Sequence, residues 1–550
     1  MATRATPPSA LERDGPISEP HISKHPRGAP GALTLPLLYR TLAESPNFIP
    51  RMTQTVVVPL WLLVILVGFS LWLVLDRFLL PSFRWILRRK VNQVIDQVNK
   101  SLDISLRPFQ LTKRQVLLDR LRFDPEVMKA LDEYAQQEGV PRAEVQSQVD
   151  RYVHEIVPSF NAYMYYRIGY WLAKKVARLL YRVRVNFLYE FTPGNFDQDA
   201  TVVFIMNHRS NMDYILVSFL AARKTALSYA VGEWAKIWPL EGLIKSMGAF
   251  FVRRNSNNPL YRKVLQRYIA MAAREGVCQA AFPEGGLTTD GKLRNPRMGL
   301  INYMLKDFDP KHHHNILFVL VAINYDRTLE DRSLLRSKNK ELPRRSKWFV
   351  TKTTMGFLFR NVRLMLRSHW KKFGYASVNF GHPISAKDFL LERHDQWPQL
   401  PDEEKFATLE SLAEYFMTTI GEIIPVLPTS VVCQVLLTQP QPQDRLQIKS
   451  QALALVNQLE QQGAPVATEA NKLEKVLESA IDMLTKRRLM LATDMGFVAN
   501  PDELDLLKYY RNTLDGWLSD TEKGAQGAGA IQQSDEVKTE SVLVDQELPH

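Results

Sequence analysis

An uncharged apolar run near the N-terminus predicts a membrane-spanning helix. Val56–Leu75 reads VVVPLWLLVILVGFSLWLVL, twenty residues without a charged side chain. At about 1.5 Å per residue, a helix of this length crosses a hydrocarbon core of about 30 Å. Trp61 and Trp72 lie near its ends, where indole rings favour the interface. Five basic residues follow between positions 76 and 90, against two in the twenty residues before the run. We therefore expect a single transmembrane helix within residues 54–80, with the larger C-terminal part in the cytoplasm.

The segment that follows, residues 81–184, is predicted to be mainly helical. Asp124–Glu138 begins with an N-cap aspartate and a proline and is ended by Gly139. Phe160–Arg184 holds six tyrosine or tryptophan residues and six basic residues, and no acidic one. Its apolar residues recur at helical spacing, so we interpret it as a basic amphipathic helix that faces anionic lipid. Packing against the following domain is the alternative.

Between residues 185 and 390, strand-like apolar runs alternate with helical segments, which is typical of an α/β domain. The strand candidates are VNFLYEF (185–191), TVVFIM (201–206), ALSYAV (226–231), AFFVRR (249–254), CQAAFP (278–283), NILFVLVAIN (315–324) and ASVNFG (376–381). The pattern therefore predicts one α/β domain over residues 185–390.

The two ends of the chain and the region after the α/β domain have other patterns. Residues 1–50 hold nine prolines, about three times the usual share, and we expect them to be disordered. Residues 391–520 are predicted to be helical, for example over 403–424 and 470–492. Residues 521–550 carry six acidic and two basic residues and are predicted to form a disordered acidic tail.

The charge balance narrows the classes of partner. Lys and Arg number 70 and Asp and Glu 58, which gives a net charge of +12 and a pI near 9.4. An excess of this size suits nucleic acid, an anionic membrane face or a phosphorylated substrate. Because the signatures of nucleic-acid-binding modules are missing, we expect no nucleic-acid partner. Cys278 and Cys433 cannot form a disulfide framework and fit a reducing compartment.

An ionisable pair interrupts the buried pattern of the α/β domain. The stretch NHRSNMDYIL follows the strand candidate TVVFIM and places His208 five residues before Asp213. On an ideal helix these residues would point about 140° apart. The two can meet only if His208 lies in the turn before the helix and Asp213 in its first turns. A carboxylate so placed fixes the imidazole tautomer and stabilises the imidazolium, an arrangement that activates a hydroxyl. A polar loop at a strand end is the alternative.

A pair of arginines is the second candidate for chemistry. The stretch GAFFVRRN puts Arg253 and Arg254 directly after a strand-like run. Paired guanidinium groups at a strand end can clamp a phosphate through two parallel hydrogen bonds. A solvated arginine pair is the alternative.

A glycine-containing turn is the third candidate. In FPEGGLTTDGKLRNPRMGL (282–300) a strand runs into Glu284, which could accept a substrate hydroxyl or order the arginines. Backbone N–H groups at paired glycines can receive an anion. The residues of this stretch that we expect in an anion site are Gly285, Gly286, Lys292 and Arg297, with Arg294 beside them. An ordinary glycine turn with a surface carboxylate is the alternative.

In this order, the three motifs resemble the glycerolipid acyltransferase family. They read His-x4-Asp, Gly-x-x-Phe-x-Arg-Arg and Phe-Pro-Glu-Gly. NHRSNMDY, the extension EGG-x4-GKL-x2-PR-x-G and INYDRTLE (323–330) point to its glycerol-3-phosphate acyltransferase branch. VNFGHPIS (378–385) resembles the family's late strand. The resemblance covers residues 185–390 and implies a mixed sheet flanked by helices.

The resemblance implies an activity for this site. A long-chain acyl group would pass from acyl-CoA or acyl carrier protein to a hydroxyl of glycerol 3-phosphate, the first step of phospholipid synthesis. His208 would act as general base oriented by Asp213. Arg253 and Arg254 would hold the phosphate, and Glu284 and Gly285 would shape the acceptor site. No cofactor, metal or covalent acyl-enzyme is required, and we expect the protein at a bacterial inner membrane, in contact with lipid.

Two departures from the branch pattern leave the acceptor open. The branch usually has an arginine after Glu-Gly-Gly, where this chain has Leu287, and a proline where Leu320 stands. Lysophosphatidate or dihydroxyacetone phosphate could therefore replace glycerol 3-phosphate. A catalytically silent, membrane-anchored lipid-binding scaffold is the alternative from another class. The intact His208, Asp213, Arg253 and Glu284 argue against it, because a silent protein would not need all four.

The histidine run Lys311–His314 could suggest a metal site. Adjacent histidines project in different directions, and the loop has no carboxylate or cysteine at ligand spacing. We therefore predict no metal there.

Overall fold

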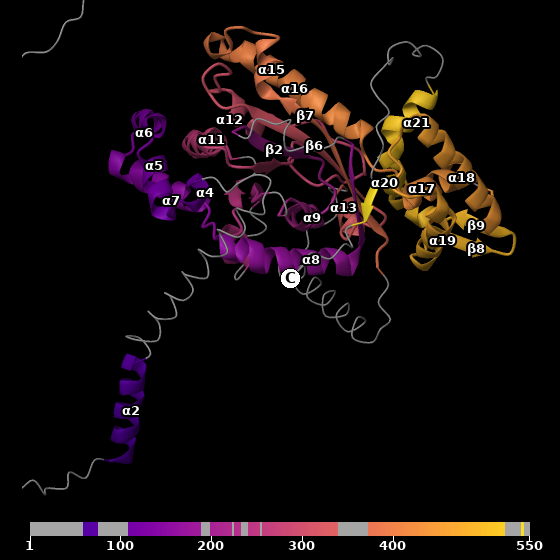
Figure 1. Cartoon of the computed structure of the whole chain (residues 1–550), viewed down its shortest axis with the longest axis horizontal. Helices are drawn as coiled ribbons and strands as arrows, with labels where there is room; N and C mark the ends of the chain where they lie inside the picture. The colour runs from indigo at the N-terminus through magenta and orange to yellow at the C-terminus, as the bar shows by residue number, and fades with distance from the viewer. Residues whose placement is uncertain are drawn as a thin grey trace, which may run out of the picture. The chain divides into compact units, whose positions relative to one another are not determined.

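The computed structural model describes residues 59–74, 108–188, 199–222, 225–232, 240–253, 256–338, 372–439, 441–522 and 541–543. The chain divides into two units, Met1–Arg84 and Trp85–His550. In the first unit the described element is helix α2 (Leu60–Val74), labelled in Figure 1. Its large apolar side chains between Leu60 and Phe69 are exposed. None of the helices in the described ranges is both long and apolar enough to cross a membrane. The predicted span, residues 54–80, is described only over residues 59–74. The predicted disordered segment, residues 1–50, lies outside the described ranges.

A mixed sheet forms the centre of the second unit. Its strand order is β10-β1-β7-β6-β2-β5-β3-β4. The strands are β1 (Arg182–Phe187), β2 (Thr201–Met206), β3 (Ser228–Gly232), β4 (Phe250–Val252), β5 (Gln279–Ala281), β6 (Ile316–Tyr325), β7 (Tyr375–Ser385) and β10 (Ser541–Leu543). Neighbours are parallel except at β6–β7 and β1–β10. The seven predicted strands are all present, and the mixed sheet is confirmed.

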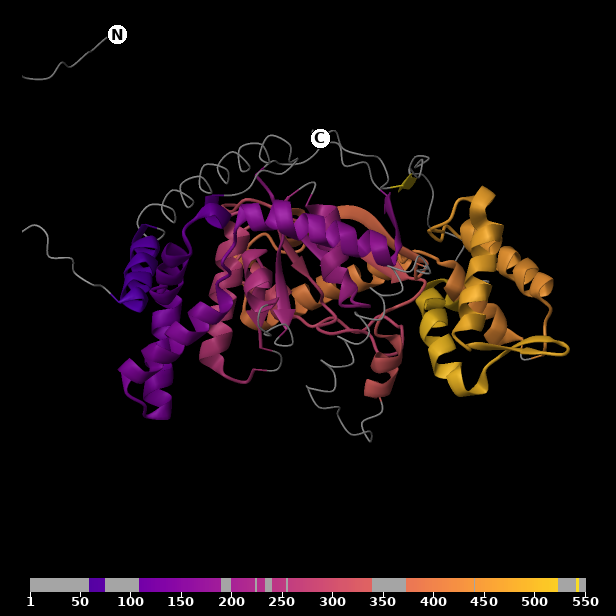
Figure 2. The ribbon, with the colours of Figure 1, turned by 90° about the horizontal axis from the view of Figure 1, so that it is seen from below.

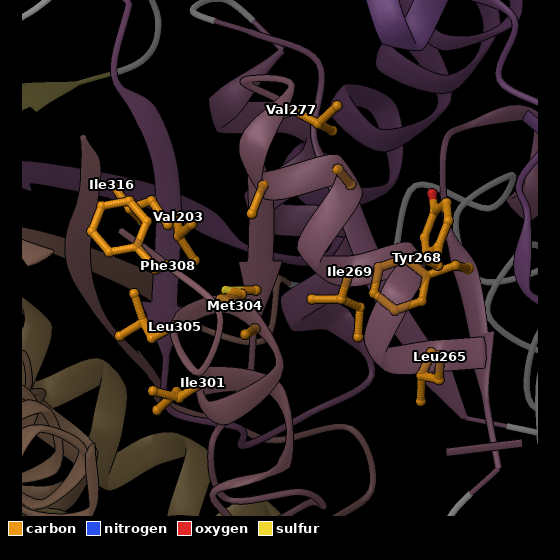
Figure 3. Packing of buried hydrophobic residues seen from close by; sticks show 14 of the residues in the cluster. Val203, Leu265, Tyr268, Ile269, Val277, Ile301, Met304, Leu305, Phe308 and Ile316 are labelled. Carbon is orange, nitrogen blue, oxygen red and sulfur yellow. The ribbon is translucent and has the colours of Figure 1, made fainter. Parts of the chain in front are cut away.

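Strand β2 runs through the middle of the sheet and is buried on both faces. Because successive side chains of a strand point to opposite faces, Val203 and Ile205 join one apolar cluster, and Val202 and Phe204 join the other. The first cluster also takes residues of α11 and α12, as Figure 3 shows. A strand buried on both faces explains why TVVFIM is a continuous apolar run.

Helices cover both faces of the sheet. Figure 1 shows α15 and α16 on one side of the sheet and α8 and α9 on the other. The helices of this domain are η2 (Met164–Gly169, a π-helix), α8 (Tyr170–Leu180), α9 (Met212–Ala221), α10 (Leu240–Ser246), α11 (Pro259–Arg274), α12 (Gly299–Leu305), α13 (Asp331–Lys338), α15 (Ala386–Leu391), the short 3₁₀ helix η4 (Trp397–Gln399) and α16 (Asp402–Glu422). Predicted helix 403–424 corresponds to α16.

A small group of helices precedes the sheet. These helices are α4 (Pro108–Leu111), α5 (Arg114–Arg122), α6 (Pro125–Glu138) and α7 (Arg142–Ile156). The capping prediction for α6 is confirmed: the Asp124 side chain accepts hydrogen bonds from two backbone N–H groups, and Gly139 ends the helix in the left-handed region at φ 64°. Asp124 also accepts two hydrogen bonds from Arg267 of α11, at 2.9 Å each, which ties α6 to the α/β domain.

The C-terminal helices have an apolar core of their own. They are α17 (Pro428–Thr438), α18 (Arg445–Gln461), α19 (Ala470–Lys486), η5 (Pro501–Glu503), α20 (Leu504–Arg511), η6 (Asn512–Leu514) and α21 (Asp515–Glu522), with the hairpin β8 (Met490–Thr493) and β9 (Gly496–Ala499). The predicted helix 470–492 therefore ends at Lys486, and its last residues enter a strand. Within the predicted disordered tail, 521–550, the described strand β10 pairs with β1.

The basic helix predicted over Phe160–Arg184 is shorter than expected. The helical part ends at Leu180, and Arg182 already belongs to β1. The alternating residues of β1 pair in register with β7, almost two hundred residues away in the chain. This long-range pairing outweighs the local helical pattern, because strand residues are stabilised mainly by their cross-strand neighbours. Figure 2, seen from below, shows residues 164–180 running across one face of the sheet.

Candidate active site

The turn between β2 and α9 brings the predicted pair together. His208 lies in the turn and Asp213 in the first turn of α9, as the helical spacing required. The distance from His208 Nδ1 to Asp213 Oδ2 is 2.9 Å, and both residues are almost fully buried. Because the carboxylate oxygen accepts this bond, we assign the proton to Nδ1. The other ring nitrogen, Nε2, is then left as the acceptor of a proton.

Asp213 is held by three further donors. Its Oδ2 accepts hydrogen bonds from the backbone N–H of Arg209 at 2.7 Å and of Ser210 at 3.0 Å. Its Oδ1 accepts from the Tyr325 hydroxyl at 2.6 Å. Burial and the neighbouring charge of Asp213 raise the pKa of Tyr325 well above its ordinary value, so this phenol keeps its proton and donates. The carboxylate that orients His208 is therefore itself fixed in position.

The turn is also fastened to strand β6 and to the segment after it. The Asn207 side chain donates to the Ile323 carbonyl at 2.9 Å and accepts from the Ile323 N–H at 2.7 Å. Glu330 accepts from the Ser210 hydroxyl at 2.7 Å and from the Asn211 amide at 3.1 Å. The stretch INYDRTLE thus supplies groups that support the histidine turn. Its presence in the sequence was a signal, but its residues were assigned no role there.

Glu284 lies beneath the histidine and faces away from solvent. Its carboxylate accepts hydrogen bonds from the backbone N–H of His208 at 2.7 Å and of Arg294 at 3.1 Å. Burial raises the pKa of Glu284 to about 7, although these hydrogen bonds oppose the rise. The side chain therefore positions the histidine turn. It does not line the cavity described below.

The raised pKa of Glu284 gives a testable dependence of stability on pH. Since the folded-state pKa lies above the ordinary value of 4.5, the stability this group contributes is fully present below about pH 4.5 and is lost as the pH rises through about 7. In Glu284→Gln this loss should disappear. The melting temperature of the wild type relative to that of Glu284→Gln should therefore fall between pH 4.5 and 8. Glu410→Gln, an exposed site on α16, should leave the wild-type pH dependence unchanged, and an identical profile for all three proteins would contradict this assignment.

A cavity of about 380 Å³ opens beside His208. Its walls are largely apolar and come from the ends of β2 to β5 and from α11 and α12. Three arginines, Arg253, Arg262 and Arg297, line it together with Gly285 and His208. Among the described lining residues there is no carboxylate and no second histidine. An apolar cavity with a few cations and one base is suited to a ligand that has an apolar part and an anionic group.

Arg253 lies where the sequence predicted an anion-binding residue, but it already has a partner. Its guanidinium donates to both carboxylate oxygens of Glu155 on α7, at 3.0 and 2.7 Å. The hydrogen bond and the charge of Glu155 raise the pKa of Arg253. The rings of Tyr152 and Tyr261 flank the guanidinium at 5.0 and 5.1 Å. The predicted partner Arg254 lies outside the described residues.

The glycine turn contributes to the cavity through one residue. Gly285 has a φ of 65°, and a Cβ there would lie 2.5 Å from Cδ of Arg297, so glycine lets the Arg297 side chain cross it. Gly286 is buried and does not line the cavity. Lys292 does not line it either, since its ammonium pairs with Asp515 at 3.0 Å. The structure therefore gathers His208, Arg253, Gly285 and Arg297 around one cavity, whereas Glu284, Gly286 and Lys292 are absent from its described lining.

The loop after the glycine turn rests on the C-terminal helices. Buried Arg209 donates to the Gly291 carbonyl at 3.0 Å, and Asn512 donates to the Asp290 carbonyl at 2.9 Å. Gly291 has a φ of 84°, and a Cβ there would lie 1.9 Å from the Tyr509 carbonyl oxygen. These contacts give residues 391–520, whose role the sequence left open, a position next to the site.

The two departures noted in the sequence lie away from the cavity. Leu287 packs against the apolar core of the C-terminal helices. Leu320 is fully buried within β6 and belongs to the core between the sheet and α11, α12 and α16. Neither side chain lines the cavity.

The histidine run lies in the turn between α12 and β6. His312 and His313 both contact Asp309, through its carboxylate at 2.7 Å and its backbone N–H at 2.8 Å. Within the described ranges no group of three histidine, cysteine, aspartate or glutamate side chains could hold a metal ion. Both cysteines are buried and unbridged.

Two regions of the chain match models of known protein families. Residues 190–317 match the model of the Acyltransferase family, and residues 356–515 match the model of the glycerol-3-phosphate acyltransferase C-terminal region. The second match extends far beyond the region of resemblance in the sequence and includes most of the C-terminal helices. By these matches the chain is similar to the glycerolipid acyltransferases. The C-terminal match and the curated relatives are glycerol-3-phosphate acyltransferases.

Individual relatives agree with this assignment. A glycerol-3-phosphate acyltransferase of Pseudomonas putida is 28% identical over 361 residues, which is 63% of this chain and 41% of the relative. That of Pseudomonas entomophila is 28% identical over 435 residues, covering 74% of this chain and 49% of the relative. The chain thus spans less than half of the length of these relatives. A crystal structure of the 1-acyl-sn-glycerophosphate acyltransferase of Thermotoga maritima covers 45% of this chain and 75% of its own at 16% identity, and its TM-score of 0.26 is too low to support an argument.

Proposed function

We propose that the protein transfers a long-chain fatty acyl group from acyl-CoA or acyl carrier protein to a hydroxyl of glycerol 3-phosphate. The observation that carries this proposal is the hydrogen bond between His208 and Asp213 at the edge of an apolar cavity lined by arginines. The proposal is also supported by the relatives' names, which are glycerol-3-phosphate acyltransferase.

His208 is the general base of the proposed reaction. Its Nε2 takes the proton of the acceptor hydroxyl while the hydroxyl oxygen attacks the thioester carbonyl carbon. The imidazolium formed is stabilised by Asp213, which keeps Nδ1 bound throughout. The carbon–sulfur bond then breaks, and the thiol leaves with the proton that His208 had taken. The hydroxyl proton thus ends on sulfur, and no covalent acyl-enzyme, cofactor or metal is needed.

The acceptor phosphate binds at the arginines of the proposed site. Arg253 and Arg297 supply positive charge from the cavity lining, and Gly285 gives Arg297 its path to the cavity. Arg254, the next residue in the chain after Arg253, is proposed to add a third charge. A phosphate at Arg253 would share that guanidinium with Glu155. Glu284 shapes the acceptor site indirectly, through the backbone of His208. Lys292 also acts indirectly, because its ion pair with Asp515 ties the following loop to α21.

The test of the proposed function is a matrix of substrates. Purified full-length protein is offered glycerol 3-phosphate, dihydroxyacetone phosphate and lysophosphatidate, each with acyl-CoA and with acyl carrier protein. We expect the highest kcat/KM with glycerol 3-phosphate. A higher kcat/KM with either of the other acceptors would reassign the acceptor. If no pair of substrates gives turnover, the result supports the alternative of a catalytically silent, lipid-binding scaffold.

We also propose that the protein works at a membrane, with α2 as an anchor and the η2–α8 face against the lipid surface. All large apolar side chains described between Leu60 and Phe69 are exposed. On η2 and α8, Ile168, Trp171 and Leu172 are exposed. The basic residues beside them are exposed Arg167 and Lys175 and half-buried Lys174. Apolar and basic side chains on one helix face suit an anionic lipid surface.

The charges of the η2–α8 face should set the preference for anionic lipid. In the triple variant Arg167→Gln/Lys174→Gln/Lys175→Gln, the ratio of binding to anionic and to neutral vesicles should fall by more than about tenfold, because each basic residue near the surface contributes about 1 kcal/mol. Flotation with vesicles of several compositions measures this ratio. An apolar anchor contributes equally to binding of anionic and of neutral vesicles, so its contribution does not affect the ratio. The matched control is Lys449→Gln/Lys475→Gln/Lys486→Gln on α18 and α19, which keeps the same net charge as the test variant. An equal loss in both would refute the orientation.

A further inference from the structure

Arg262 is a cation of the cavity that the sequence motifs did not single out. It lies in α11 and lines the same cavity as His208, Arg253 and Arg297. Its Nε donates to the Ser256 carbonyl at 2.6 Å, and its Nη2 donates to the Asn257 side chain at 3.3 Å. The loop before α11 therefore fixes the orientation of the guanidinium, which lowers the entropic cost of binding a ligand there.

The neighbouring cations have acidic partners, whereas Arg262 has none among the described residues. Arg253 is bound to Glu155 through two hydrogen bonds. Lys263, the next residue of α11, lies 3.6 Å from Glu126. For Arg262, no carboxylate within the described ranges lies at ion-pair distance. A guanidinium that is oriented and has no carboxylate partner in the described part of the chain is suited to bind an anion from solution.

The position of Arg262 in α11 concentrates positive charge. The helix begins at Pro259, and its first turn has no acidic residue. A helix N-terminus carries a partial positive charge, so a cation there is destabilising and an anion is stabilised. Arg262 and Tyr303 of α12 line the same cavity. Burial raises the pKa of Tyr303, and the positive charge of nearby Arg262 opposes that rise. The arrangement favours an anionic ligand at the α11 end of the cavity.

We propose that Arg262 is a specificity-determining residue that binds the phosphate of the acceptor together with Arg253 and Arg297. This inference rests on the proposed function. The phosphate groups of coenzyme A offer the same chemistry as the acceptor phosphate. We assign the site to the acceptor because Arg262 and His208 line one cavity of about 380 Å³. A small acceptor must present its hydroxyl and its phosphate within that space.

The first test is steady-state kinetics of full-length Arg262→Gln with each substrate varied in turn. We expect the KM for glycerol 3-phosphate to rise about tenfold or more, as the loss of a charge-assisted hydrogen bond predicts. The kcat and the KM for acyl-CoA should stay within about twofold of the wild type. Arg262→Lys should restore part of the affinity, since it keeps the charge but loses the fork geometry. The matched control is Lys263→Gln, which removes a cation from the same helical turn outside the cavity lining. It should leave all three constants unchanged.

The second test separates this inference from the proposed function. Isothermal titration measures the Kd of glycerol 3-phosphate for the wild type and for Arg262→Gln without any acyl donor. A higher Kd, that is weaker binding of glycerol 3-phosphate, in the variant supports the inference. An unchanged Kd and acceptor KM, or a rise confined to the KM of acyl-CoA, overturns it. If the wild type binds glycerol 3-phosphate through Arg262 but transfers no acyl group to it, the proposed function fails while the binding site stands.

Discussion

Replacing His208 with alanine is expected to lower kcat for acyl transfer by about 10²–10⁴-fold, the usual contribution of a positioned general base. The reason lies in the composition of the cavity wall. Within the described lining, His208 is the sole imidazole and no carboxylate is present, so no neighbour can take over the proton. The KM values should change little, because the imidazole contacts the reacting hydroxyl rather than the phosphate. Initial rates with saturating glycerol 3-phosphate and acyl-CoA measure the effect.

The matched control for this experiment is His312→Ala. His312 is exposed and lies in the turn before β6, outside the cavity lining. Its replacement should leave kcat unchanged. Circular dichroism and the melting temperature show whether His208→Ala keeps its fold. A correctly folded His208→Ala protein that retains wild-type turnover would remove His208 as the base.

Asp213→Asn is expected to lower kcat by about 10²-fold or more while the fold is kept. The amide oxygen can replace Oδ2 and accept from the N–H groups of Arg209 and Ser210 and from His208. The amide nitrogen then faces the Tyr325 hydroxyl, which can turn and accept a hydrogen bond instead of donating one. The geometry survives in this orientation, but the negative charge that stabilises the imidazolium is lost.

Circular dichroism and the melting temperature distinguish this loss of charge from a disturbed fold. Both should stay close to those of the wild type in Asp213→Asn, because every hydrogen bond of Asp213 can be kept. Tyr325→Phe serves as the companion variant, since it removes one hydrogen bond to Asp213 but leaves the charge. It should lower kcat less than Asp213→Asn does. A kcat for Asp213→Asn within threefold of the wild type would exclude the proposed role of the carboxylate.

The local part of the site could be predicted from the sequence. The apolar run of β2 and the geometry of an ideal helix were enough to place His208 in the turn and Asp213 in the first turn of α9. The seven strands followed from apolar runs in the same way. Each of these inferences uses residues close together in the chain, where helical and strand periodicities determine directions.

The partners of these residues could not be predicted, because they come from distant segments. Tyr325 reaches Asp213 across 112 positions. Lys292 was expected at the phosphate, yet Asp515, more than two hundred residues further on, pairs with it. Glu284 was expected to face the substrate, but the backbone of His208 and Arg294 binds both of its oxygens. A single sequence contains no periodicity that reports such contacts.

The contact between Gly291 and Tyr509 restricts which substitutions and recombination events this protein can tolerate during evolution. Their backbones meet so closely that a side chain at position 291 would overlap the Tyr509 carbonyl. The loop that contains Gly291 and the C-terminal helices therefore form complementary surfaces, and we expect substitutions in one to require substitutions in the other. An exchange of either region between diverged relatives would join two surfaces that had not been selected together. Recombination between relatives should therefore be tolerated best when Gly291 and Tyr509 both come from the same parent sequence.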